Sequence, residues 1–246
     1  MDIMIAMKQK KKRIEIIDAL RGLAVVLMVI HHLLYDFVDI LGAPKWLFTN
    51  PVFDVLHYMF AGLFIFLSGL SSRFTRSNIK RGLIAIALSA GISAVTYFMD
   101  MPIWFGVLHL LGFSMLFFGL TRKLWDLIPK KAAPVLFIVL IIAGALATKY
   151  LSPGSDNVLI RATLWVLGWS QPGFISYDYF PLLPWLFVFL LGTWAGTYVT
   201  ERKLPEWFYD KKIPVFPPIG RKALIIYILH QPVLYGLVTG ISALFL

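Results

Sequence analysis

The chain has 246 residues, of which 59% are hydrophobic and only 15% are charged. A soluble domain of this size could not bury so much apolar surface in one core, so part of that surface must face lipid. The sequence contains no cysteine, which excludes disulfides, a thiol nucleophile and a cysteine-ligated metal.

Apolar runs of about 20 residues, long enough to cross roughly 30 Å of hydrocarbon as helices, recur along the chain. They predict an all-α polytopic membrane protein, a bundle of about seven transmembrane helices in a single domain covering residues 1–246. The predicted spans lie near 17–40, 52–72, 80–99, 103–121, 132–151, 180–200 and 221–244. The segment near 158–169 is apolar but short and contains Arg161, so we expect an interfacial or re-entrant helix there.

The connections between these spans alternate in charge. One set is rich in lysine and arginine, beginning with "MKQKKKR" before the first span, whereas the other contains only Lys45, Lys149 and Arg161 of the 23 basic residues. By the positive-inside rule the N-terminus is expected in the cytoplasm, and seven crossings place the C-terminus outside. The net charge of +10 is then explained by topology and by contact with anionic membrane lipids, and not by nucleic-acid binding.

The first span carries one polar stripe. At about 100° per residue, Arg21, His32 and Asp36 fall on one helical face, together with Asp18 and Asp39. Ionisable groups facing lipid cost several kcal/mol each, so the stripe must face other helices or water. Asp18 and Arg21 have the spacing of an ion pair at the cytoplasmic end.

All five histidines lie in predicted spans. His32, with Asp36 one turn away, has the arrangement of a His–Asp pair in which the carboxylate orients a general base. His31 and His57 are candidates to assist, while His109 is expected to form an interhelical hydrogen bond and His230 has a structural or a functional role. No pair of histidines has the spacing of a metal site, so no metal is expected.

A group of basic residues follows the second span. Arg73, Arg76 and Arg81 either flank the spans for topology or meet a phosphate-bearing donor that approaches from the cytoplasm. The end of the second span is rich in small and hydroxylic residues, including Ser68. Such residues favour close helix packing, and they also leave room for a slender ligand.

Four segments are distinctive in combination: "IDALRGLAVVLMVIHHLLYD", "LFIFLSGLSSRF", "YDYFPLLPWLFVFLLGTWAG" and "LIIYILHQPVLY". From about residue 14 to 238 the chain resembles the catalytic-domain family of heparan-alpha-glucosaminide N-acetyltransferase, in a compact bacterial form. The resemblance implies a polytopic acyltransferase that takes an acetyl group from cytoplasmic acetyl-CoA. The acceptor would be an amine or hydroxyl of a sugar or glycan on the outer side. The sequence has no N-x-[ST] glycosylation acceptor, which is consistent with a bacterial inner membrane.

The resemblance also assigns residues. Asp18, Arg21 and Gly22 match the first-helix motif of the family, but the connection 41–53 lacks the catalytic histidine that the lysosomal enzyme has there. The base would therefore be His32, oriented by Asp36, or else His31 or His57. From the positions of the basic, hydroxylic and imidazole side chains, and not from the resemblance, the residues expected to contact acetyl-CoA are Arg21, Arg73, Arg76, Arg81, Ser68 and His230.

Several alternatives stay open from the sequence. Direct acetyl transfer and an acetyl-histidine intermediate are both compatible with these residues. A proton-coupled transporter could use the His/Asp stripe as a proton relay. A noncatalytic membrane partner of an envelope-polymer machine is a third hypothesis. The sequence also leaves open whether the chain forms a homo-oligomer.

Overall fold

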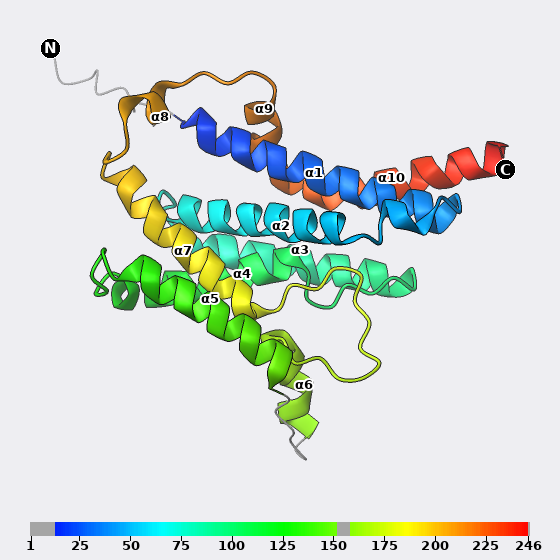
Figure 1. Ribbon diagram of the computed structural model, residues 1–246, viewed down its shortest axis with the longest axis horizontal. Coiled ribbons are helices and arrows are strands. Elements are labelled where there is room, and N and C mark those ends of the chain that lie inside the picture. Colours follow the sequence, from blue (N-terminus) through cyan, green and yellow to red (C-terminus); the bar gives the residue numbers. More distant parts are fainter. Residues whose placement is uncertain (1–12, 152–157, 246) are drawn as a thin grey trace, which may run out of the picture. The chain divides into compact units, whose positions relative to one another are not determined.

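The computed structural model describes residues 13–151 and 158–245, and the basic stretch at 7–12 lies outside them. Within those residues the secondary structure is helical, apart from one isolated bridge between Phe105 and Tyr179 (Figure 1). The elements are α1 Glu15–Ile40, η1 Lys45–Leu47, α2 Pro51–Ser72, α3 Asn78–Phe98, α4 Val107–Trp125, α5 Ala133–Tyr150, α6 Val158–Leu167, α7 Leu182–Thr200, α8 Glu206–Asp210, α9 Phe216–Arg221 and α10 Ala223–Phe245.

Seven of the described helices, α1, α2, α3, α4, α5, α7 and α10, are long and apolar enough to cross a membrane. This confirms the predicted all-α membrane protein with about seven spans. The fourth span begins at Val107 and not near 103, because Phe105 first forms the bridge with Tyr179. The helix expected near 158–169 is α6, whose 10 residues are too few to span.

The chain divides into two compact units. The terminal unit contains the residues up to Asn50 and those from Leu204 onward, with α1, η1, α8, α9 and α10. The central unit runs from Pro51 to Lys203 and contains α2 to α7. Each unit has its own packing, described separately below.

In the terminal unit α1 packs against α9 and α10, and α10 runs alongside α1 (Figure 1). Two glycines bring α1 and α9 close together: a Cβ on Gly22 would lie 2.2 Å from the carbonyl oxygen of Phe216. A Cβ on Gly220 would lie 1.8 Å from the carbonyl oxygen of Asp18. The backbones therefore meet at a distance that only glycine permits.

Charged side chains hold the same end of α1. Asp18 accepts hydrogen bonds from Arg21 at 3.0 Å and from Arg221 at 3.4 Å, and its carboxylate is buried. Glu15 accepts from Lys212 at 3.2 Å and from the backbone N–H of Ile213 at 3.0 Å. The predicted Asp18–Arg21 ion pair is confirmed, and it extends to the segment before α10.

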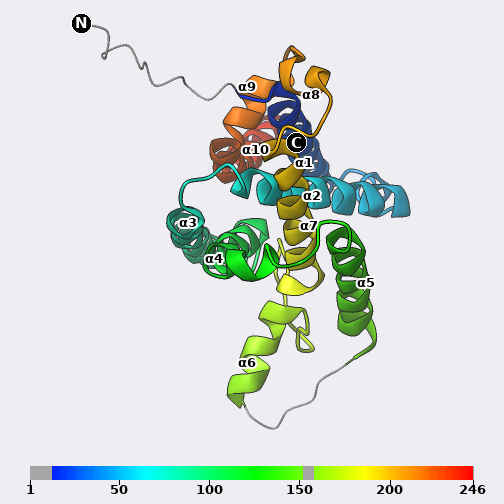
Figure 2. The same ribbon diagram turned by 90° about the vertical axis from the view of Figure 1, so that its left-hand side faces the viewer.

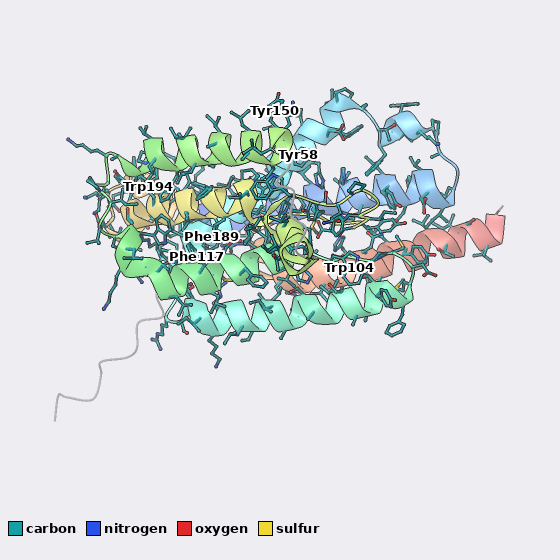
Figure 3. The ribbon with its side chains drawn as sticks, turned by 90° about the horizontal axis from the view of Figure 1, so that it is seen from below. Tyr58, Trp104, Phe117, Tyr150, Phe189 and Trp194 are labelled. Carbon is teal, nitrogen blue, oxygen red and sulfur yellow. The ribbon has the colours of Figure 1, made fainter. Side chains whose placement is uncertain are left out.

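In the central unit α2 and α5 pack on α7, and α3 packs on α4 (Figure 2). A Cβ on Gly69 would lie 2.0 Å from the carbonyl oxygen of Phe189, and one on Gly192 would lie 2.0 Å from that of Phe66. Small residues thus serve close packing of α2 and α7, as expected. Phe189 is fully buried, while Trp104 and Trp194 lie at opposite ends of this unit (Figure 3).

Candidate active site

Helices α1 and α10 bring two histidines together inside the terminal unit. The ring centroids of His32 and His230 lie 4.8 Å apart, with the planes nearly perpendicular at 83°. His31 lies beside His32, at 5.8 Å between centroids, and 4.8 Å from the ring of Phe48. Tyr35 contacts Phe48 as well, at 5.2 Å. The two adjacent histidines therefore point to different neighbours.

The hydrogen bond of His32 defines its tautomer. Nδ1 of His32 lies 2.9 Å from the carbonyl oxygen of Met28. A carbonyl oxygen only accepts, so Nδ1 carries the proton and donates it. In the neutral ring Nε2 then holds the lone pair, and this nitrogen has no hydrogen-bond partner among the described residues. The backbone of α1 thus leaves the lone pair of the neutral His32 ring on Nε2.

Asp36 is held by α10. Its carboxylate is 1% exposed, and Oδ1 accepts a hydrogen bond of 2.9 Å from Nε2 of Gln231. Nδ1 of His32 is hydrogen-bonded to the carbonyl of Met28, and the orientation of His32 by Asp36 stays a prediction. The expectation that the stripe faces another helix is confirmed for His32 and Asp36. Asp39, at the end of the same face, is exposed.

His230 repeats the pattern of His32. Its Nδ1 lies 2.6 Å from the carbonyl oxygen of Tyr227 and donates to it, so its Nε2 also holds a lone pair. Three side-chain atoms of this cluster are buried and have no hydrogen-bond partner in the part of the chain that the structure describes: Oδ2 of Asp36, Nε2 of His230 and Oε1 of Gln231. Gln231 is the residue that sequence reasoning missed. Its signal was a glutamine directly before Pro232 inside an otherwise apolar helix.

The residues expected to contact a phosphate-bearing donor differ in their burial and in their hydrogen-bond partners. Arg73 is buried, donating to the carbonyl of Thr193 at 2.8 Å and to Asp126 at 2.5 Å. Arg81 donates to Thr75 at 2.6 Å, and the hydroxyl of Ser68 donates to the carbonyl of Phe64 at 2.8 Å.

Arg76 differs from these residues because it is exposed and forms no hydrogen bond or ion pair with the described residues. It is therefore the arginine of this group that a phosphate could approach without breaking an internal contact. Arg21 is paired with Asp18, as described above.

The remaining histidines belong to the central unit. His57 lies 5.7 Å from the ring of Phe180 and 5.5 Å from that of Tyr58. His109 accepts from the backbone N–H of Gly106 at 3.2 Å, so its other nitrogen donates to Ser93 on α3 at 3.2 Å. The interhelical hydrogen bond predicted for His109 is confirmed.

Two residues in connections outside the spans have shifted pKa values. The hydroxyl of Tyr179 donates to the carbonyl of Trp165 at 2.5 Å, and burial raises the pKa of Tyr179 to about 12. Hydrogen bonds from Lys130 and Lys203 lower the pKa of Glu201 to about 2. Across residues 13–151 and 158–245, no three His, Asp or Glu side chains are grouped to hold a metal ion.

Seven span-length helices and a buried cluster of imidazole, carboxylate and amide groups define a polytopic membrane protein with a polar site inside its helices. Residues 13–232 match the family model described as "Heparan-alpha-glucosaminide N-acetyltransferase, catalytic". The match covers most of the chain, so the protein belongs to this family. Comparisons with curated proteins and with solved structures gave no significant match.

Proposed function

We propose that the protein is a membrane acetyltransferase that uses acetyl-CoA from the cytoplasm and acetylates an amine or hydroxyl of a sugar or glycan on the outer side. Membership of the acetyltransferase family supports the reaction class. The observation that carries the proposal is the hydrogen bond of His32, which sets the tautomer of its ring. Its Nδ1 proton is donated to the carbonyl of Met28, so a lone pair remains on Nε2. The buried Asp36 lies one turn further along α1.

In the proposed direct mechanism, Nε2 of His32 takes the proton of the acceptor amine or hydroxyl. The acceptor nitrogen or oxygen attacks the thioester carbonyl, and a C–N or C–O bond forms as the C–S bond breaks. Coenzyme A leaves as the thiolate and takes the proton from the imidazolium of His32. Proton transfer of this kind contributes about 10²- to 10⁴-fold to a rate, which sets the loss expected without His32.

The phosphates of acetyl-CoA are proposed to bind at the basic end of the central unit. Arg76 is exposed and has no partner among the described residues, and Lys80 is exposed close by in sequence. Arg73 contributes positive charge from a fixed position, because Thr193 and Asp126 already hold its guanidinium group. The acetyl-CoA contacts of Arg21, Arg81 and Ser68, and the assisting roles of His31 and His57, stay predictions.

The test uses protein purified in lipid nanodiscs, with acetyl-CoA binding and acetyl transfer measured separately. We expect His32→Gln to bind acetyl-CoA like the wild type while transfer falls by about 10²-fold or more. Arg76→Gln should weaken acetyl-CoA binding without changing the transfer rate at saturation. Thr239→Val, an exposed and nearly isosteric change on α10, is the control.

The proposal fails if the wild type neither binds acetyl-CoA nor transfers its acetyl group. Uptake driven by a proton gradient in proteoliposomes without acetyl-CoA would instead identify a transporter. Transfer that continues unchanged in His32→Gln would keep the enzyme but remove His32 from its chemistry.

A further inference from the structure

The buried atoms without hydrogen-bond partners are concentrated at one place. The described residues contain five such side-chain atoms, and three of them belong to Asp36, His230 and Gln231. The other two, on Asn78 and Ser114, lie in the central unit. Since unpaired buried polar groups are costly, three of them on contacting helices indicate a site for a ligand.

All three atoms are hydrogen-bond acceptors. The amide nitrogen of Gln231 donates to Asp36, so the unpaired atom of this amide is its oxygen. Nδ1 of His230 donates to the carbonyl of Tyr227, so the unpaired Nε2 holds a lone pair. The third atom is a carboxylate oxygen of Asp36. The site therefore lacks donors, and its ligand must supply them.

We propose that Asp36, His230 and Gln231 bind the acyl acceptor through a group that carries two or more N–H or O–H donors, and that Gln231 positions the carboxylate of Asp36. Neighbouring hydroxyls on a sugar ring, or a hydroxyl beside an amine, have this chemistry. The phosphates and the thioester carbonyl of acetyl-CoA offer acceptors, so they would meet only acceptors here. His230, expected from sequence to contact acetyl-CoA, is thereby assigned to the other substrate.

The position of the site fits this role. His230 is the ring next to His32, at 4.8 Å between centroids, and Asp36 lies one turn beyond His32 on α1. A donor group held by these acceptors would lie beside the proposed base. The inference rests on the proposed function for the identity of the ligand as an acyl acceptor, whereas the donor-binding chemistry follows from the three atoms alone.

The experiment uses full-length protein in lipid nanodiscs with glucose and glucosamine as probes. Permethylated glucose, which has no O–H donor, is the matched ligand control. Equilibrium binding of each sugar is measured without acetyl-CoA, and KM and kcat for each sugar are measured with it. The variants are Gln231→Met, which keeps the length of the side chain, and Asp36→Asn, with Thr239→Val as the control on the same helix.

We expect glucose or glucosamine to bind, and permethylated glucose not to bind. In Gln231→Met the dissociation constant and the KM of the sugar should rise about 10- to 100-fold, because a bond to a charged group is lost. Acetyl-CoA affinity should stay within about twofold, which a general loss of structure would not allow. Asp36→Asn should give a similar rise in KM.

Two results would overturn the inference. One is a sugar KM in folded Gln231→Met equal to that of Thr239→Val. The other is the absence of binding of both sugars to the wild type. If the wild type binds a sugar in a Gln231-dependent way but transfers no acetyl group, the inference stands and the proposed function falls. If the wild type transfers acetyl groups and neither Gln231→Met nor Asp36→Asn changes the KM of the sugar, the proposed function stands and the inference falls.

Discussion

The contact between α1 and α9 makes a quantitative prediction for Gly220→Ala. The added Cβ would lie 1.8 Å from the carbonyl oxygen of Asp18, whereas ordinary contact begins at 3.4 Å, so the helices must separate by up to 1.6 Å. This separation would also stretch the bond of 3.4 Å between Arg221 and Asp18. Overpacking of this kind costs about 3 kcal/mol, and the helix preference of alanine over glycine returns at most about 1 kcal/mol.

Gly236→Ala is the matched control, because, apart from its chain neighbours and its own helix backbone, no atom of residues 13–151 or 158–245 lies within 4 Å of its added Cβ on α10. It should be neutral or stabilising by about 0.5–1 kcal/mol. The two variants should therefore differ by roughly 3 kcal/mol, or about 6–12 °C in Tm for a chain of this size. Thermal unfolding in one detergent, with each protein eluting as a single species, measures this difference. Equal Tm values would refute the close backbone contact at Gly220.

Three further predictions concern the central unit. Hydrogen bonds from Lys130 and then Lys203 lower the pKa of Glu201 from 4.5 to about 2, so these bonds stabilise the fold above pH 4.5 and are lost as pH falls toward 2. Glu201→Gln should thus flatten the acid dependence of Tm, and an unchanged slope would contradict this. Arg73→Gln should cost about 1.5–3 kcal/mol of unfolding free energy, because the largely buried guanidinium loses its hydrogen bonds to the carbonyl of Thr193 and to the partly exposed carboxylate of Asp126, whereas exposed Arg76→Gln should change it by less than about 0.5 kcal/mol. Equal Tm values for Arg73→Gln and Arg76→Gln would refute the stabilising role of the Arg73 contacts. His109→Leu should lower stability by about 1–3 kcal/mol with unchanged transfer per folded molecule, and a selective loss of transfer would give His109 a catalytic role.

The sequence predicted the spans because lipid imposes a length and a composition that can be read from apolar runs. It also predicted that the polar face of α1 is covered, because His32 and Asp36 could not face hydrocarbon. Both predictions depend on the free energy of transferring a side chain from water to lipid, which each side chain has independently of its neighbours. The same reasoning gave the interhelical role of His109, a lone polar residue on an apolar helix.

The partners of these residues could not be predicted in the same way. Apolar residues that face lipid and those that face another helix have similar composition, so periodicity gives a face but not the helix that covers it. Gln231 as the donor to Asp36 and the carbonyl of Met28 as the acceptor from His32 depend on the register of α10 and on backbone geometry. The charge of Arg73 was visible, but not its burial against Thr193.

The first-helix motif gains a physical meaning from this distinction. Asp18 and Arg21 join α1 to Arg221, and Gly22 lets α9 approach, so the motif fixes where α1 lies against the segment that leads into α10. Further along α1, its contact with α10 brings His32 to His230 and Asp36 to Gln231. A shift at the motif would move one helix along the other and separate these pairs. The motif therefore positions the polar site from a distance, and substitutions in it should alter stability and site geometry together.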